Sequence, residues 1–293
     1  MPSGDADVKL SHPDKVLFPD DGITKADLAA YYASVADAML PLVHERPMNL
    51  WRWNTGIDGQ RVVQQEIPKG APEWVARVEV PRRRGGNVVH AMIGDARTLR
   101  WLANQNCITP HVWNSRADRL DRPDRIVFDL DPSVEDELEQ FEDVRAAALA
   151  LGEHLRELGL VPYAMTTGSR GIHVVAPIRR THDANAVRTR AGEIAEAFAA
   201  SHDTLTTAWR KEKRDGRILV DTARNTYAQT VVAPYAVRAL PGAPVATPLE
   251  WTELEAPDLH PRRWTVRDLA SRLSETGDPW SDIRRDARNL GLK

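Results

Sequence analysis

Three aspartates at the ends of apolar segments are the residues of this sequence best placed to do chemistry, and two of them share the segment DLDP (129–132). The segment follows the apolar run RIVF (125–128), which predicts a strand. Alternate strand residues point to one face, so Asp129 and Asp131 would lie side by side while Leu130 points into the core. Two like charges that close are costly without a cation, and carboxylate oxygens suit Mg²⁺ or Mn²⁺. The alternative is a solvated strand end.

The third aspartate, Asp221, ends a second apolar run, RILVD (217–221). If the two runs are neighbours in one sheet, three carboxylates meet at one edge. Such a set can hold two metal ions for in-line phosphoryl or nucleotidyl transfer: one ion activates the attacking hydroxyl and the other stabilises the leaving pyrophosphate. The alternative for Asp221 is a cap of the turn that begins at Thr222.

A glycine-rich turn, TGSRGIH (167–173), lies between these two runs in the sequence. Its glycines let backbone N–H groups approach an anion, and Arg170 beside Ser169 supplies a planar fork for phosphate oxygens. His173 begins the next strand and can donate a hydrogen bond to a phosphate. No Gly-Lys-Ser/Thr follows, so the turn is not a Walker loop. The alternative is an ordinary hairpin turn with an exposed arginine.

Further residues could help to neutralise a triphosphate. Arg224 and Arg238 follow Asp221 in the sequence, and His111 lies in the segment PHVW (110–113). Several cations should converge on a ligand with up to four negative charges. A single histidine beside a tryptophan is, however, more often structural than a ligand.

Two basic segments have competing interpretations. A turn before Gly85-Gly86 is either a solvated hairpin tip or a grip on a nucleic-acid backbone; it contains Arg82, Arg83 and Arg84. The segment KRDG (213–216) fits the K-x-D-G motif, in which a lysine, here Lys213, attacks the α-phosphate of ATP. The chain ends at residue 293, too soon for the rest of an adenylation domain and its OB-fold. A polar turn that leads into RILVD is therefore favoured.

The N-terminal part is predicted to mix helices with short strands, after ten residues of loose tail. Thr24, with Asp27 as its capping partner, begins a helix that Pro41 ends. Periodicity and turn residues predict three further segments: a strand at 47–53, two strands around the basic turn within 74–93, and a helix at 96–106.

The middle of the chain predicts a regular order of elements. Apolar residues three and four apart indicate a helix from Phe141 to Leu158 that stops at Gly159. The other expected elements are strands at 161–167 and 172–178, a helix at 184–199, a strand at 217–220 with a hairpin partner at 229–237, and a helix at 265–274. This order predicts an α+β fold with helices on one face of a sheet. No clear linker interrupts it, which favours one composite domain.

Composition excludes several classes of protein. The chain has 293 residues, 42% hydrophobic and 28% charged, which is enough for a sizeable core. No apolar run reaches the roughly 18–20 residues of a membrane span, and the N-terminus lacks a secretory signal. The single cysteine, Cys107, excludes a disulfide framework and indicates a reducing compartment. The net charge of −3 excludes a uniformly basic coat protein, although 32 of 39 basic residues are arginines, as phosphate binding or a GC-rich genome would give.

Taken together, these segments make the chain resemble the polymerase domain of bacterial ligase D, a member of the archaeo-eukaryotic primase superfamily that works in non-homologous end joining. The resemblance covers nearly the whole chain and rests on the order of its motifs: HPDKVLFP (12–19), RPMNLWRW (46–53), TLRWLANQ (98–105), VFDLDP (127–132), TTGSRGIHVVAPI (166–178), LVDTARN (219–225), VAPYAVR (232–238) and GDPW (277–280).

The resemblance implies a primase-polymerase fold with an RRM-like catalytic sheet and an N-terminal α/β module. Its approximate parts are a DNA and 5′-phosphate module at 1–115, a catalytic module at 116–250 and a tail at 251–293. It implies two Mn²⁺ or Mg²⁺ ions on the three aspartates and a ribonucleotide or deoxyribonucleotide triphosphate substrate. It also implies two sets of contacts: the nucleotide at His111, Thr167, Ser169, Arg170, His173, Arg224 and Arg238, and a DNA 5′-phosphate at Lys15 and Lys25. Arg52 and the basic turn are further candidate DNA contacts.

The chain departs from the family pattern in two respects. Val62-Val63 stands where the family usually has two phenylalanines, so the grip on base or template is expected to differ. No ligase or 3′-phosphoesterase domain is present, which fits a stand-alone relative or an excised domain. The expected DNA partner is a 5′-phosphorylated gap, break or primer-template, and the expected protein partners are a DNA ligase and Ku. No membrane association is expected. The expected location is the bacterial cytoplasm, on the nucleoid when the chain is bound to DNA. Gap filling in excision repair and a non-catalytic module that recruits a ligase are the alternatives.

Overall fold

The computed structural model describes residues 8–82, 85–134 and 139–291, so the predicted DNA contacts Arg83 and Arg84 lie outside the described residues. The chain divides into two compact units. The first unit comprises Met1–Leu120, Thr230–Ala246 and Trp264–Asp278, and the second comprises Asp121–Gln229, Thr247–Arg263 and Pro279–Lys293. Each unit therefore contains segments that are far apart in the sequence.

The first unit contains a four-stranded sheet in the order β13-β7-β3-β4. Its strands are Thr230–Val232 (β13), Cys107–Trp113 (β7), Met48–Trp53 (β3) and Arg61–Gln64 (β4). Two antiparallel pairs accompany it: Val16–Phe18 (β1) with Ile23–Thr24 (β2), and Arg77–Pro81 (β5) with Asn87–Ala91 (β6). The helices are Lys25–Ser34 (α1), Ala36–Val43 (α2), Ala96–Asn104 (α3) and Leu269–Thr276 (α6).

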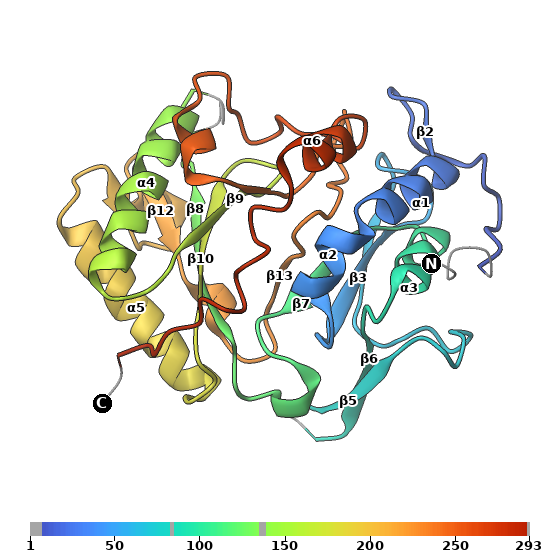
Figure 1. Cartoon of the computed structure of the whole chain (residues 1–293), viewed down its shortest axis with the longest axis horizontal. Coiled ribbons are helices and arrows are strands. Elements are labelled where there is room, and N and C mark those ends of the chain that lie inside the picture. Colours follow the sequence, from blue (N-terminus) through green and yellow to red (C-terminus); the bar gives the residue numbers. More distant parts are fainter. Residues whose placement is uncertain (1–7, 83–84, 135–138, 292–293) are drawn as a thin grey trace. The chain divides into compact units, whose positions relative to one another are not determined.

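The core of the first unit forms where α1 and α3 pack together and α3 packs on β7 (Figure 1). Tyr32 of α1 is fully buried and its hydroxyl donates to the Ile108 carbonyl of β7 at 2.7 Å. Burial of such an aromatic ring, with its polar tip satisfied, fixes the helix against the strand.

The second unit contains a six-stranded sheet in the order β11-β12-β8-β10-β9-β14, and Figure 1 shows α4 and α5 on one side of it. The strands are Leu205–Thr206 (β11), Ile218–Asp221 (β12), Arg125–Asp131 (β8), Ile172–Pro177 (β10), Tyr163–Thr166 (β9) and Thr247–Leu249 (β14). The helices are Phe141–Glu157 (α4) and Ala184–Ala200 (α5), and short 3₁₀ helices lie at Ala117–Arg119 (η1, first unit), Lys211–Lys213 (η2), Ala223–Asn225 (η3) and Trp251–Glu255 (η4).

The predicted α+β fold is confirmed, and the strand-helix-strand-strand-helix-strand order is that of β8, α4, β9, β10, α5 and β12. The capping box of Thr24 and Asp27 is also confirmed, with 2.8 Å between the Thr24 nitrogen and Asp27 Oδ2. Among the described residues, no helix combines the length and apolar character that a membrane span requires.

Two predictions about elements are wrong in detail, and one strand was missed. The helix predicted to end at Pro41 breaks earlier, at Val35, and resumes as α2 with Pro41 inside it, because a proline removes only one backbone donor while Leu42 and Val43 pack in the core. The last helix begins at Leu269 and not at residue 265. β14, which adds an edge strand to the second sheet, was not predicted at all.

The hairpin predicted between 217–220 and 229–237 is the most consequential error. β12 pairs instead with β8 and β11, and β13 pairs with β7. The reason lies in Asn225: its buried side chain accepts a hydrogen bond from the Val127 nitrogen at 2.9 Å and donates to the Val127 carbonyl at 2.7 Å. This contact holds η3 against β8 and directs the chain away from a tight β-turn.

Candidate active site

The three aspartates come together through the register of β8 and β12, as the sequence predicted. The two strands are antiparallel, with Asp221 directly opposite Asp129 and Leu219 opposite Asp131. Directly opposed residues and residues two apart on one strand share a face. The side chains of Asp129, Asp131 and Asp221 therefore stand on the same face, which we call the carboxylate edge, while Leu130 is fully buried on the other face.

The electrostatics of the carboxylate edge reflect repulsion and burial. Burial raises the pKa of the Asp131 carboxyl well above its usual range, and the neighbouring carboxylate of Asp129 adds to the rise. The side chains of Arg170 and His173 act in the opposite direction. His173 lies directly across from Asp129 on β10, with 3.3 Å between His173 Nε2 and Asp129 Oδ1. Arg170 and His173, which the sequence singled out as phosphate-binding candidates, thus lie beside the aspartates.

A cation would fit the donor chemistry of this edge, since three carboxylates on one sheet face are hard oxygen ligands. In the described part of the chain, however, no three His, Cys, Asp or Glu side chains converge as a complete ligand set. At Asp221, Oδ1 accepts a hydrogen bond from the Ala223 nitrogen at 2.7 Å. The turn cap that was the alternative for Asp221 is therefore present, and it coexists with the position beside Asp129.

The glycine-rich turn is organised differently from the prediction. Its backbone N–H groups were expected to face an anion, but those of Ser169, Arg170 and Gly171 point to the Thr167 hydroxyl oxygen at 3.2–3.3 Å. One hydroxyl oxygen thus accepts from all three donors within the turn, at distances long for N–H···O hydrogen bonds. Arg170 is exposed, and its charge lies near enough to the carboxylate edge to lower the pKa of Asp131.

Close approach of backbone explains one glycine of this turn. A Cβ atom added to Gly171 would lie 2.1 Å from the Leu130 carbonyl oxygen and 3.3 Å from Asp131 Oδ1. No side chain fits there, and the turn is therefore pressed against β8 next to the carboxylates. Arg262, which the sequence did not single out, holds the same turn from outside: its Nε donates to the Ser169 carbonyl at 3.0 Å.

The remaining predicted residue of the second unit is Arg224, which is exposed on η3. It directly follows Ala223, whose backbone nitrogen donates to the Asp221 carboxylate. Two predicted nucleotide contacts, His111 and Arg238, belong to the first unit. The backbone nitrogen of Arg238 donates to the Pro244 carbonyl at 2.7 Å. His111 is buried on β7, where its Nδ1 lies 3.1 Å from the Thr109 carbonyl.

The structural alternative for His111 has support in the first unit. The imidazole stacks on the Trp51 indole, with ring centroids 3.7 Å apart and planes 19° apart. The Arg61 guanidinium covers the indole at 4.3 Å. Nearby on the same sheet, Val62 and Val63 are 41% and 46% exposed, so this aliphatic pair stands at the surface.

Lys15 and Lys25 line one pocket of the first unit, which we call the lysine pocket. It measures about 540 Å³ and is also lined by Ser11, His12, Asp14, Asn104 and Asn106. Lys25 is only 3% exposed, and its ammonium donates to the Ser11 and Asn104 carbonyls at 2.7 and 3.2 Å. Burial lowers the pKa of Lys25, and the charge of Lys15 lowers it further.

The predicted DNA contacts Arg52 and Arg82 are engaged within the first unit. Arg52 donates from Nε to the Gln105 carbonyl at 2.8 Å and from Nη1 to Gln64 Oε1 at 2.6 Å. Arg82 is exposed and lies 3.6 Å from a Glu66 carboxylate oxygen. An exposed ion pair of this kind contributes little to folding stability, so Arg82 can exchange its partner for another anion. The hydrogen bonds of Arg52, in contrast, give it a structural role.

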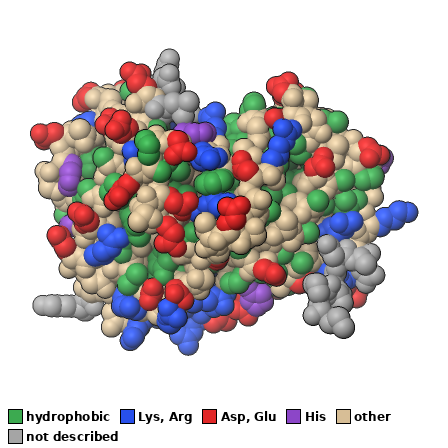
Figure 2. Space-filling view, turned by 45° about the horizontal axis from the view of Figure 1, so that its top comes forward, with side chains coloured by type: hydrophobic (Ala, Val, Ile, Leu, Met, Phe, Trp, Pro, Cys, Tyr) green, Lys and Arg blue, Asp and Glu red, His purple; other side chains and the backbone are tan. Residues whose placement is uncertain are grey.

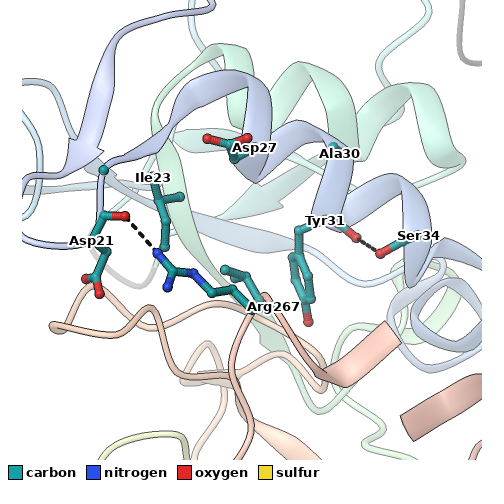
Figure 3. Close-up of a pocket in the computed structure, with 9 residues that line it drawn as sticks. Asp21, Ile23, Asp27, Ala30, Tyr31, Ser34 and Arg267 are labelled. Atoms are coloured by element: carbon teal, nitrogen blue, oxygen red, sulfur yellow. Dashed lines mark hydrogen bonds between the residues drawn. The ribbon is translucent and has the colours of Figure 1, made fainter. Parts of the chain in front are cut away.

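Surface charge and a second pocket complete the description. Acidic and basic side chains are interspersed over the face shown in Figure 2, in keeping with the net charge of −3. A pocket of about 450 Å³ in the first unit lies between α1 and Arg267 (Figure 3). There Arg267 donates to the Asp21 carbonyl at 2.8 Å, and the Tyr31 hydroxyl donates to the Tyr235 carbonyl at 2.8 Å. These contacts tie α1 to the later segments of the unit.

Comparison with known proteins gives consistent matches. The family model described as "LigD, primase-polymerase domain" matches residues 24–280. The Mycobacterium tuberculosis "Multifunctional non-homologous end joining DNA repair protein LigD" is 32% identical over 289 residues, which cover 96% of this chain and 37% of the relative. The Bacillus subtilis "Bifunctional non-homologous end joining protein LigD" is 28% identical over 281 residues, or 95% of this chain and 44% of the relative. The chain thus spans less than half the length of these curated relatives.

A solved structure extends the match to three dimensions. The "Polymerase Domain from Mycobacterium tuberculosis Ligase D in complex with DNA" superposes with a TM-score of 0.87 and 30% sequence identity. The superposition covers 96% of this chain and 99% of that one. Nearly all of this chain therefore matches that polymerase domain.

Proposed function

Because the chain belongs to the family of LigD primase-polymerase domains, we propose that it is a DNA-directed nucleotidyltransferase of non-homologous end joining. In this proposal it adds nucleotides, preferably ribonucleotides, to a primer 3′-OH at a DNA break or short gap, and residues 1–293 act as one functional domain. The observation that carries the proposal is the carboxylate edge: β8 and β12 are in register, so Asp129 and Asp221 are directly opposed with Asp131 beside them.

Asp129, Asp131 and Asp221 would hold two divalent cations, Mn²⁺ or Mg²⁺. When bound, such ions supply a lowered pKa at the attacking hydroxyl and charge stabilisation at the leaving pyrophosphate. The residues themselves supply the negative charge that attracts the ions and a rigid sheet that fixes their spacing. The Oδ1 atom of Asp221 accepts a hydrogen bond from the Ala223 nitrogen, and its second carboxylate oxygen would be the one that shares an ion with Asp129.

Arg170 is assigned to the phosphates of the incoming nucleotide, supported by its exposure beside the carboxylate edge. His173 is assigned to orienting Asp129, which lies 3.3 Å from it, and to the adjacent phosphate. Thr167 and Ser169 shape the turn that carries Arg170, and Arg224 adds charge after Asp221. His111 and Arg238 remain predicted nucleotide contacts on the family resemblance.

The lysine pocket is assigned to the 5′-phosphate of a gap or break. Two ammonium groups line it, and a bound phosphate dianion would offset both the burial of Lys25 and its repulsion by Lys15. Arg82 is retained as a contact to the DNA backbone. A DNA ligase and Ku are the proposed protein partners, and the cytoplasm, on the nucleoid, is the proposed location.

The test is primer extension on a 5′-phosphorylated gap with ribonucleotides and Mn²⁺. The wild-type chain should extend the primer, and the double variant Asp129→Ala, Asp131→Ala should lose extension while its affinity for the gapped DNA survives. If the wild type binds the gap but adds no nucleotide with either metal, the chain is instead a binding module that recruits a ligase. Full extension by the double variant would refute the assignment of the carboxylate edge.

A further inference from the structure

The connection between β11 and β12, residues 207–217, is a basic loop of the second unit that the proposed reaction does not use. It carries the most exposed large apolar side chain among the described residues, Trp209, which is 75% exposed. Five of its eleven residues are basic and two are acidic, in a chain whose net charge is −3. An exposed indole among cations is unusual enough to need an explanation, because most tryptophans are largely buried.

The backbone that carries Trp209 is held in place by the loop's own arginines. Arg214 donates from Nε to the Ala208 carbonyl at 3.2 Å and from Nη2 to the Trp209 carbonyl at 2.8 Å. Arg217 in turn donates from Nε to the Arg214 carbonyl at 3.0 Å. These bonds use two of the five cations to fix the loop, and they leave the indole exposed on a defined backbone.

The other three basic side chains of the loop are exposed. Among the described residues, the side chains of Arg210, Lys211 and Lys213 make no ion pair, whereas Arg217 lies 3.7 Å from the Asp215 carboxylate. Arg210 directly follows Trp209, and the two lysines lie on η2. One face of an indole and three uncompensated cations are therefore offered to solvent within five residues.

The basic loop is anchored next to the carboxylate edge. The Ser133 hydroxyl, two residues beyond Asp131, donates to the Arg217 carbonyl at 2.5 Å. Gln140 donates to the Gly216 carbonyl at 2.6 Å. The loop then enters β12, in which Leu219 is opposite Asp131. A polynucleotide strand lying along the carboxylate edge could continue over the loop without leaving the second unit.

We propose that Trp209, with Arg210, Lys211 and Lys213, binds an unpaired stretch of a nucleic-acid strand. Base–aromatic stacking and phosphate neutralisation are the two contributions that single-strand sites combine, and this loop supplies both. The strand must be unpaired because the base faces of a duplex are covered by their neighbours. A protein partner fits less well, since one isolated apolar side chain surrounded by like charges offers no apolar core for an interface. The inference deepens the proposed function, on which it rests for its DNA substrate.

The experiment measures binding of a fluorescein-labelled oligothymidylate by anisotropy, beside an abasic oligonucleotide of the same length and a blunt duplex. Trp209→Ala should weaken binding of the oligothymidylate at least about fivefold, the factor that a stacking energy of about 1 kcal/mol converts to. Trp209→Phe should restore most of the affinity because it retains a stacking ring. Neither variant should change the affinity for the abasic strand or the duplex.

The double variant Lys211→Ala, Lys213→Ala should weaken binding of both single strands and reduce the dependence of affinity on salt. Its matched control is Arg188→Ala, which removes an exposed arginine of α5 in the same unit and should leave all affinities unchanged. Equal oligothymidylate affinity of wild type and Trp209→Ala would overturn the inference, as would an equal loss on the abasic strand.

The same measurement on Asp129→Ala, Asp131→Ala separates this inference from the proposed function. Loss of extension with preserved Trp209-dependent binding supports both. Extension by the wild type without any effect of Trp209 on binding overturns the loop site alone, and Trp209-dependent binding without extension overturns the polymerase assignment alone.

Discussion

Asp129, Asp131 and Asp221 stand on neighbouring strands whose register sets their spacing, whereas Lys15 and Lys25 are held by loops and by the start of a helix. The carboxylate edge gathers like charges, whose repulsion and burial raise the pKa of Asp131 while Arg170 and His173 lower it. The lysine pocket gathers two like charges of the other sign and satisfies them in part with carbonyl oxygens, among them that of Asn54 for Lys15. Sheet register thus fixes the positions of the carboxylates, and loop backbone fixes the two lysines around a pocket that suits an anion.

The largest effect is expected where sheet register positions the charge. Asp221→Asn keeps the volume of the side chain but removes one charge from the carboxylate edge, so nucleotide addition should fall about a thousandfold, the loss of several kcal/mol of metal-ion stabilisation. Affinity for 5′-phosphorylated gapped DNA should stay within about twofold, because the lysine pocket is untouched. Asp203→Asn, an exposed aspartate of the same unit, is the matched control. A comparable fall in gap affinity would show that the carboxylate edge and the lysine pocket do not have separate roles in catalysis and in DNA binding.

The converse change addresses the lysine pocket. Lys25→Ala or Lys15→Ala should reduce the preference for a phosphorylated over an unphosphorylated gap about ten- to hundredfold, as expected for a charge-assisted hydrogen bond. The rate of addition to an open primer-template should not change. Competition binding with the two gaps measures the preference, and Lys69→Ala, an exposed lysine of the first unit, provides the control. A wild-type chain with equal affinity for both gaps would contradict the assignment of the pocket.

A smaller effect tests how closely the glycine-rich turn depends on β8. Gly171→Ala places a methyl group on the Leu130 carbonyl, so the turn must move, at a cost of about 1–3 kcal/mol in the free energy of unfolding. The KM for the nucleotide should rise because Arg170 moves with the turn. In Gly192→Ala, with open space in α5, the free energy of unfolding should instead rise by up to about 1 kcal/mol. Urea unfolding of both variants decides: equal behaviour would show that the turn is not pressed against β8.

The pH dependence of gap binding gives the mildest test. The folded-state pKa of Lys25 is lowered, so the free protein gives up this proton at a lower pH than an ordinary lysine does. The preference for a 5′-phosphate should therefore decline at a lower pH than the ordinary pKa of a lysine would give. Lys15→Ala removes the second cause of the lowering, and the residual preference should decline at higher pH. Titration of binding in both proteins measures this, and a decline at the same pH in both would contradict the coupling. Because folding lowers the pKa of Lys25, its charged form reduces the free energy of unfolding at low pH. This loss of stability disappears as the pH rises through the folded-state pKa and Lys25 becomes neutral.

Local periodicity was sufficient to predict much of the second unit. Alternation in RIVFDLD placed Asp129 and Asp131 on one face, and the apolar spacing from Phe141 to Leu158 located α4. The capping box at Thr24 was equally readable because its partners are three residues apart. These features depend only on residues close together in the sequence.

Contacts between distant segments could not be predicted in this way. The partner of β13 is β7, more than a hundred residues earlier, and β14 pairs with β9 although α5 and four strands lie between them in the sequence. Arg262 reaches the Ser169 carbonyl from 93 residues away, and nothing in its local sequence marks it. The sequence shows that Asn225 lies in a turn after a strand. Its hydrogen bonds to Val127, however, join residues that only the fold brings together.

The most direct test of the carboxylate edge is the binding of Mn²⁺ itself. Electron paramagnetic resonance of free Mn²⁺, titrated with the chain and a non-hydrolysable ribonucleotide triphosphate, reports how many ions each chain takes up. The account predicts two ions for the wild type and a loss of most of this binding in Asp129→Asn, Asp131→Asn, with no loss in Lys15→Ala, Lys25→Ala. Mn²⁺ binding by the aspartate variant equal to that of the wild type would contradict the central claim.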